Sequence, residues 1–173
     1  MPLKPILFLL ALATAIGSHA QNSDDDLRQS LQDGYTLYFI NPAEFKALKG
    51  KAKMEADFTF SYSQAIPEKV DMRFSLLSKA PIRTVDSLAF YQEGARIGGT
   101  ETVESMFLEK SRGKWQGRYE TALPYSTLFS ILEAGANLMV KVYYDKKSLS
   151  FPAGKDWREA SEVVVEILAV EIK

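Results

Sequence analysis

Residues 53–63 read KMEADFTFSYS, and this stretch decides the fold class because its apolar and polar side chains alternate without a break. The apolar side chains occupy every second position: Met54, Ala56, Phe58, Phe60 and Tyr62. Successive side chains of a β-strand point to opposite faces, so the pattern predicts a strand with one buried and one solvated face. Residues 70–76 repeat the pattern after a turn that contains Pro67, and the two segments together predict an antiparallel hairpin.

Further segments of the same kind surround this hairpin. Strands are expected at residues 35–40 and 83–92, the latter followed by a Glu93-Gly94 turn, and further hairpins at 102–121 and 138–151. The sequence therefore predicts a mainly β protein, an antiparallel, jelly-roll-like β-sandwich with two to four short helices at its edges. Since no repeat, low-complexity tract or linker divides the chain, we expect residues 21–173 to form one domain.

Local signals predict helices at residues 23–32, 42–49 and 123–133 and from residue 156 onward. Ser23 and Asn41 are suited to be helix caps, and Pro42 suits a first helical position. Gly135 would end the third helix, and Asp156–Glu159 reads as a capping box for the fourth. The last ten residues are rich in β-branched side chains, which leaves open whether they are helix or strand.

Residues 1–20 have the three-part pattern of a secretory signal peptide. Lys4 supplies a positive start, residues 6–16 are apolar and uncharged, and Ser18-His19-Ala20 offers small residues at the cleavage positions. The apolar run is shorter than the roughly 20 residues that span a bilayer. We therefore expect cleavage near Ala20, export to the periplasm or the medium, and no transmembrane segment in the mature chain.

The composition excludes several kinds of chemistry. The chain has no cysteine, and its one histidine, His19, lies in the predicted signal peptide. The mature chain would then have no disulfide, thiol nucleophile, Ser-His-Asp triad or imidazole base, and we predict no metal site and no cofactor. Loss of Lys4 leaves 20 basic and 22 acidic residues. This near-neutral balance argues against nucleic-acid binding, which needs a large positive surface.

The last quarter of the chain has the order helix, strand, strand, helix between Leu128 and Val163. Its strand residues read GANLMVKVYY at 135–144 and LSFP at 149–152. This segment resembles the C-terminal ending of small periplasmic β-sandwich proteins, namely the invasion-associated locus B proteins and some type VI secretion accessory proteins. Those proteins usually carry cysteines, whereas this chain has none. The resemblance implies a β-sandwich and assigns no functional residue.

Aromatic side chains are dense along the predicted strands, and most occupy the apolar phase, so we interpret them as core. Four are candidate binding residues for a sugar ring, an apolar ligand or a partner: Tyr91, Trp115, Tyr119 and Tyr143. Tyr91 adjoins a turn, Trp115 and Tyr119 share one face of a predicted strand, and Tyr143-Tyr144 places neighbouring rings on opposite faces.

Charged residues give no catalytic spacing, so we predict no catalytic residue. Two groups of acids lie on predicted strands, Glu101, Glu104 and Glu109 on one and Glu55 and Asp57 on another, and we interpret both as solvated faces. The run Lys46, Lys49, Lys51 and Lys53 is diluted by Glu44 and reads in the same way. The alternative for this run is contact with an anionic surface such as a lipid headgroup or a polyanionic glycan.

These observations favour an exported, non-enzymatic β-sandwich that binds a partner protein or a ligand. One alternative is a carrier of an apolar or glycan ligand in an aromatic-lined cleft. A second alternative is a hydrolase that uses carboxylates alone, because no histidine or cysteine is available to it.

Overall fold

Two antiparallel sheets and two helices make up the computed structural model, which describes residues 26–172. The predicted signal peptide, residues 1–20, lies outside the described residues. The larger sheet has six strands in the order β1-β2-β3-β4-β8-β7, and the smaller has four in the order β10-β9-β5-β6. The prediction of an antiparallel β-sandwich with helices is confirmed.

The six-stranded sheet contains β1 Leu27–Gln32, β2 Tyr35–Lys46, β3 Lys53–Tyr62, β4 Lys69–Ser78, β7 Glu104–Ser111 and β8 Lys114–Pro124. The four-stranded sheet contains β5 Ser87–Gln92, β6 Ala95–Thr100, β9 Leu138–Tyr144 and β10 Lys147–Pro152. The helices are α2 Tyr125–Ala134 and α3 Lys155–Glu171, with a short 3-10 turn, η1 Gly135–Asn137, after α2. The predicted hairpins β3–β4, β7–β8 and β9–β10 are all present.

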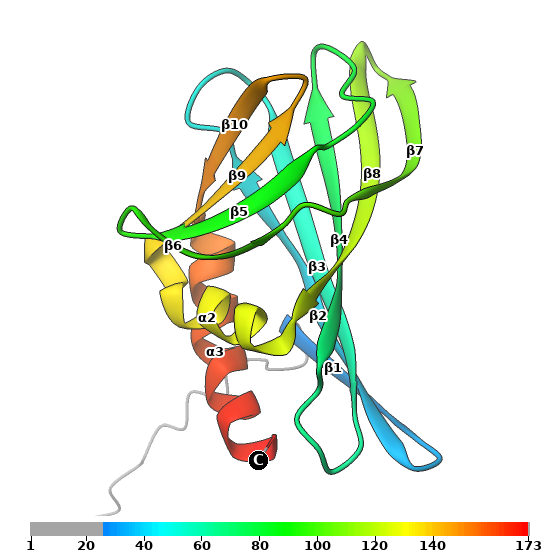
Figure 1. Ribbon diagram of the computed structural model, residues 1–173, viewed down its shortest axis with the longest axis vertical. Helices are drawn as coiled ribbons and strands as arrows, with labels where there is room; N and C mark the ends of the chain where they lie inside the picture. Colours follow the sequence, from blue (N-terminus) through cyan, green and yellow to red (C-terminus); the bar gives the residue numbers. More distant parts are fainter. Residues whose placement is uncertain (1–25, 173) are drawn as a thin grey trace, which may run out of the picture.

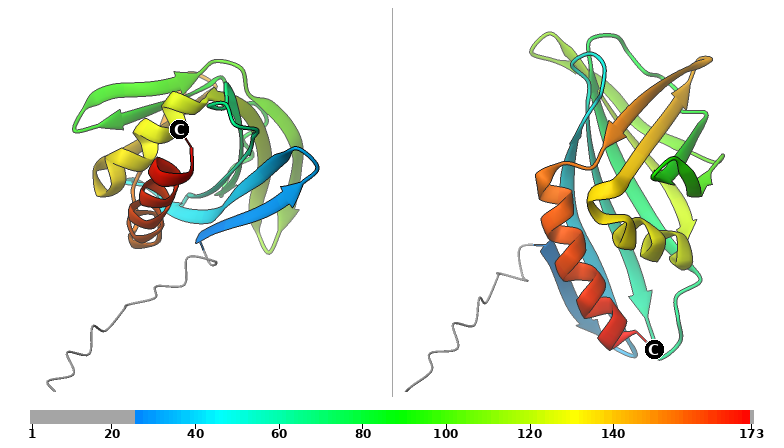
Figure 2. Two further views of the ribbon diagram at one scale, coloured as in Figure 1. Left: turned by 90° about the horizontal axis from the view of Figure 1, so that it is seen from below. Right: turned by 90° about the vertical axis from the view of Figure 1, so that its left-hand side faces the viewer.

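The large sheet curves around the rest of the molecule, and its inner face carries the core (Figure 2, left). On β3 the inner side chains are the apolar set of the alternating pattern, and Met54, Ala56, Phe58 and Phe60 are all buried. The small sheet covers the inner face toward one end of the molecule, and the helices cover it toward the other (Figure 1). Trp157 of α3 packs against two core aromatic rings, with its ring centre 5.6 Å from that of Phe45 and 6.0 Å from that of Phe58.

The two N-terminal helix predictions are wrong in the described residues. Residues 27–32 form strand β1, which pairs antiparallel with β2 and places Leu27 opposite Ile40. Residues 42–46 belong to β2, and the register against β3 shifts between Ile40 and Ala43. Pro42 lies in this irregularity, where its missing N–H costs no ladder hydrogen bond.

The predictions for the later elements need smaller corrections. The strand expected at 83–92 begins only at Ser87, and residues 79–86 form a loop held by the buried side chains of Ile82 and Val85. The last helix is present, but the predicted capping box is not. Gly154 occupies the N-cap position, no side chain caps the helix, and Asp156 lies in the first turn. The helix continues to Glu171, so residues 164–171 of the final ten are helix, and Ile172 is extended.

One end of the molecule is formed by four connections, residues 47–52, 79–86, 112–113 and 145–146, and we call it the loop end (Figures 1 and 2). Two of its turns contain residues other than glycine at positive φ: Arg112 at 49°, Asp145 at 45° and Lys146 at 58°. Such dihedrals match the twist of tight two-residue hairpins. The loop end brings together segments that are far apart in the sequence.

Candidate functional site

A groove of about 690 Å³ opens at the loop end, and we call it the basic groove. Three segments build it: the β2–β3 loop, the β4–β5 loop and the β9–β10 hairpin. Its lining residues are Lys49, Gly50, Lys51, Ala52, Ser78, Lys79, Ala80, Pro81, Ile82, Arg83, Thr84, Asp86, Tyr144, Asp145, Lys147 and Leu149. Its volume lies within the range of about 300–1,000 Å³ that is usual for small-ligand sites.

Positive charge dominates the basic groove. Five of its lining side chains are cationic and only two, Asp86 and Asp145, are carboxylates. Asp145 is engaged by Lys147, whose Nζ lies 3.2 Å from Oδ2. Within residues 26–172, no ion pair joins the other four cations, Lys49, Lys51, Lys79 and Arg83, to a carboxylate. In the part of the chain that the structure describes, cations outnumber carboxylates in the groove, and four of the cations form no ion pair.

The lysine run of the sequence divides into two parts. Lys46 and Lys53 are both held by Glu44, with Nζ to carboxylate distances of 3.7 and 2.7 Å. The hydrogen bond from Lys53 lowers the pKa of the Glu44 carboxyl below its usual value. Lys49 and Lys51, in contrast, line the basic groove. Lys49 and Lys51 are exposed, as the solvated-face interpretation predicted, but that interpretation did not foresee that they line a common groove.

Backbone hydrogen bonds fix the loops that carry these cations. The N–H of Leu48 donates to the carbonyl of Ser150 at 2.9 Å, and the N–H of Ala47 donates to the carbonyl of Ala52 at 3.0 Å. The N–H of Asp86 donates to the carbonyl of Tyr143 at 2.8 Å, which ties the β4–β5 loop to β9. These bonds and the buried side chain of Ile82 hold the backbone of the groove walls in place.

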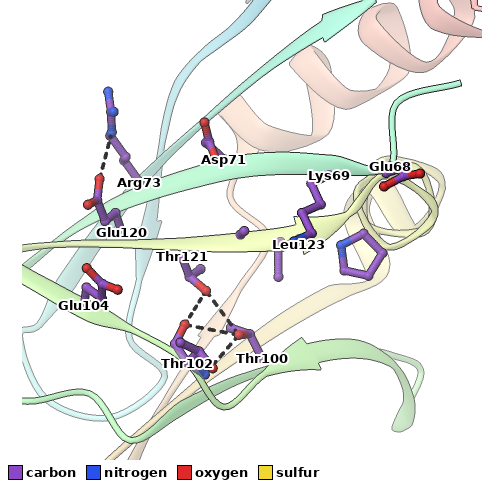
Figure 3. Close-up of a pocket in the computed structure, with 12 residues that line it drawn as sticks. Glu68, Lys69, Asp71, Arg73, Thr100, Thr102, Glu104, Glu120, Thr121 and Leu123 are labelled. Carbon is purple, nitrogen blue, oxygen red and sulfur yellow. Dashed lines mark hydrogen bonds and ion pairs between the residues drawn. The ribbon is translucent and has the colours of Figure 1, made fainter. Parts of the chain in front are cut away.

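A second cavity, of about 800 Å³, lies where β7 leaves the edge of β8, and we call it the carboxylate pocket (Figure 3). Four carboxylates line it, Glu68, Asp71, Glu104 and Glu120, together with Lys69 and Arg73. Glu104 stands directly opposite Glu120 in the β7–β8 ladder. Glu120 is also paired with Arg73, whose Nε lies 3.5 Å from its carboxylate.

Hydroxyl groups close one side of the carboxylate pocket. Thr100 and Thr121 place their Oγ1 atoms 3.1 Å apart, and Thr121 donates to the carbonyl of Thr102 at 2.5 Å (Figure 3). These bonds satisfy the hydroxyls within the protein. The other acids that the sequence singled out lie elsewhere: Asp57 is buried and ion-paired with Arg118, and neither Glu101 nor Glu109 lines this pocket.

Two of the four candidate aromatic residues meet on the outer face of the small sheet. The hydroxyls of Tyr91 and Tyr143 lie 3.4 Å apart, and Lys141 places its Nζ 4.7 Å from the centre of the Tyr91 ring. The bond to Tyr91 and partial burial raise the pKa of Tyr143, while the charge of Arg96 opposes this shift. Neither tyrosine lines the basic groove or the carboxylate pocket.

The other two candidates lie on β8. Tyr119 is fully buried, stacks on Phe74 with ring centres 5.2 Å apart, and donates its hydroxyl to the carbonyl of Ile82. Burial raises the pKa of Tyr119 to about 12. Trp115 is half-buried, carries Lys110 over its ring at 5.8 Å, and stands opposite Ser78, which lines the basic groove. Trp115 therefore lies beside the groove, and Tyr119 lies in the core.

Sequence reasoning missed the groove because its cations come from three distant segments. Lys79, Arg83 and Lys147 carry no local pattern that distinguishes them from solvated surface residues. The only available signal was the density of Lys49 and Lys51 in one loop. In the described residues, no group of three His, Cys, Asp or Glu side chains is placed to hold a metal ion.

No family model matches this chain, and no curated protein and no solved structure matches it either. The resemblance to the invasion-associated locus B type therefore stays a prediction. Between residues 26 and 172, neither helix combines the length and the apolar character that crossing a bilayer requires.

Proposed function

We propose that this chain is an exported, non-enzymatic β-sandwich protein that binds a multivalent anion in the basic groove. The single observation that carries the proposal is a set of four cations that line one groove and form no ion pair with any carboxylate of residues 26–172: Lys49, Lys51, Lys79 and Arg83. Like charges that are held together repel one another, and an anion that lies between them relieves this repulsion.

The side chains of the groove indicate the chemistry of the ligand. Four of its five cations are lysines, which act as flexible point charges and suit phosphate, sulfate or carboxylate groups without a strict geometry. Ser78 and Thr84 add hydroxyls, and Ile82 and Leu149 add apolar surface between the charges. We therefore expect a ligand with two or more anionic groups, bound mainly by electrostatic attraction.

The sequence supports the two other parts of the proposal, a non-enzymatic role and export. Residues 21–173 contain no histidine and no cysteine, the side chains that most often act as base or nucleophile near neutral pH. The signal-peptide pattern at residues 1–20 supports export.

Isothermal titration calorimetry with pyrophosphate as the probe tests this function. The wild-type protein should bind pyrophosphate, and the affinity should fall steeply as salt rises because the interaction is electrostatic. The double charge reversal Lys79→Glu/Arg83→Glu should lower the affinity at least about tenfold, since two favourable charges become unfavourable.

The matched control is Lys69→Glu/Lys155→Glu, which changes net charge equally. Both lysines are exposed and neither lines the basic groove. Its affinity for pyrophosphate should stay close to that of the wild type. Equal losses in the two double variants would show that net charge alone attracts the probe, and absence of binding by the wild-type protein would refute the proposal.

A carboxylate-only hydrolase is the second candidate, and the facing pair Glu104 and Glu120 in the carboxylate pocket favours it. Such an enzyme needs one carboxyl as proton donor and another as nucleophile or base. We would assay the protein on a panel of glycosides, together with Glu104→Gln and Glu120→Gln. Turnover that disappears in both variants would replace the binding proposal, and no turnover on the panel would remove this candidate.

A further inference from the structure

We infer that the anion bound at the loop end is the headgroup layer of an anionic lipid bilayer, on which the protein docks with Leu48 inserted. This inference rests on the proposed function, because the basic groove supplies much of the charge. It adds a partner, an orientation and an apolar contact that anion binding alone does not need. The occupant is a membrane surface, and free phosphate compounds are the comparison in its test.

Leu48 is the first observation. It lies in the β2–β3 loop between Lys46 and Lys49, and its side chain is 62% exposed. The loop is not free to bury it, since the N–H of Leu48 is bonded to Ser150 and the neighbouring Ala47 is bonded to Ala52. An apolar side chain held outward among lysines can enter the boundary between headgroups and acyl chains while the ammonium groups stay with the phosphates.

The charge of the whole loop end is the second observation. Its four connections carry six cations, Lys49, Lys51, Lys79, Arg83, Arg112 and Lys146, against the two carboxylates Asp86 and Asp145. All four connections lie at the same end of the molecule (Figures 1 and 2). Clustered lysines and arginines bind anionic lipid surfaces, and the attraction adds up over the cations that reach the surface together.

The opposite end of the molecule lacks this combination. It also exposes apolar side chains, Leu31 at 85% and Ile66 at 61%, but Asp33 and Glu68 lie two residues from them in the same turns. An anionic surface would repel those carboxylates. Among residues 26–172, exposed apolar side chains therefore occur at both ends. Those at the opposite end have carboxylates near them, with Lys69 beside Glu68, whereas Leu48 at the loop end lies among cations, and this difference fixes the orientation of docking.

Trp115 gives the docking a spectroscopic reporter. It stands opposite Ser78 at the loop end of β8 and is half-buried, whereas the only other tryptophan, Trp157, is 1% exposed in the core. Contact between the loop end and a bilayer should change the polarity around Trp115 and leave Trp157 unchanged. Its emission should therefore shift when vesicles bind.

Vesicle sedimentation tests the inference with the purified exported protein. Vesicles that contain phosphatidylglycerol should bind the wild-type protein with a shift in Trp115 emission, and pure phosphatidylcholine vesicles should not. Leu48→Asp should weaken binding about tenfold or more, since it places a carboxylate where an apolar side chain enters the interface. The matched control Leu31→Asp, at the opposite end, should bind as the wild type does.

Pyrophosphate calorimetry on the same variants separates this inference from the function on which it rests. Leu48→Asp should bind pyrophosphate within about threefold of the wild type, because Leu48 does not line the groove. Binding of pyrophosphate without binding of vesicles would overturn membrane docking and leave the proposed function intact. Equal vesicle binding by Leu48→Asp and Leu31→Asp would overturn insertion of Leu48. If the wild-type protein binds neither probe, both proposals fail.

Discussion

At the scale of single residues, Gly117 shows why one position of β8 must lack a side chain. The Tyr119 ring lies over Gly117, and a Cβ built there would come within 2.2 Å of the Tyr119 hydroxyl oxygen. Tyr119 cannot move away easily, because it is fully buried, stacked on Phe74 and bonded to the carbonyl of Ile82. Residues 117 and 119 share one face of a strand by alternation alone, but the sequence gives no sign of this contact.

Gly117→Ala should therefore destabilise the protein by about 1–3 kcal/mol through overpacking. Urea unfolding followed by circular dichroism measures the change. Gln116→Ala on the outer face of the same strand is the control and should stay within about 0.5 kcal/mol of the wild type. A Gly117→Ala protein as stable as this control would contradict the packing described.

Asp57 is the second residue whose environment the sequence did not reveal. Its polar phase in the alternating strand predicted a solvated side chain, yet its side chain is 4% exposed and forms an ion pair with Arg118. Arg118 also donates to the hydroxyl of Ser75 at 3.2 Å. The three residues form a bridge across β3, β4 and β8 on the outer face of the large sheet.

Removing one partner of a buried pair leaves an uncompensated charge, so Asp57→Ala should cost about 3 kcal/mol. This value is the lower end of the range of about 3–5 kcal/mol for removing one partner of a buried ion pair. We choose it because the Arg118 side chain is 22% exposed, so water can partly solvate its charge. The control is Glu159→Ala, which removes an exposed partner of Lys155 and should cost less than about 0.5 kcal/mol. Similar losses in both variants, measured by urea unfolding, would refute a special role for Asp57.

At the scale of elements, alternation predicted strands well and cap signals predicted helices unevenly. The β3 and β4 patterns were correct because one face of each strand is buried along its length. Asn41 and Pro42 looked like a helix start, but pairing with β3 continues on both sides of them and the bulge absorbs the proline. Local helix signals are weak when a neighbouring strand offers a full ladder of hydrogen bonds.

The end of α3 illustrates a contact that only the fold creates. The Glu171 carboxylate accepts a hydrogen bond from the Tyr38 hydroxyl at 2.8 Å and another from Gln29 at 2.9 Å, which pins the helix to β1 and β2. Burial, followed by the bond to Glu171, raises the pKa of Tyr38 well above its usual value. Burial also raises the pKa of Tyr119 and of Tyr125.

These tyrosines predict an alkaline limit to stability. Because the fold favours their neutral form, this stabilisation is complete below pH about 10, where unfolded tyrosines begin to ionise. It should be lost progressively as the pH approaches about 12, the folded pKa of Tyr119. Urea unfolding at increasing pH should show a falling free energy of unfolding, with a shallower fall in Tyr38→Phe. A flat profile across this range would contradict the prediction.

At the scale of the whole molecule, the sequence predicted the fold class better than the site. Alternating apolar residues determine the fold class locally, whereas the basic groove depends on the topology that brings residues 49, 79 and 147 to one end. The net charge of the chain also gave no indication of the basic groove, because positive and negative side chains nearly balance in total but are distributed unevenly over the molecule. A charge balance near zero therefore says little about a local anion site.

The most direct test of the anion-binding groove is a two-dimensional amide NMR titration of the isotope-labelled protein with pyrophosphate. We predict chemical-shift changes concentrated in residues 47–52, 79–86 and 144–149, with the Trp115 indole signal also affected, and a marked weakening of all of them at high salt. Shift changes centred on the carboxylate pocket, or no localised changes, would contradict the account.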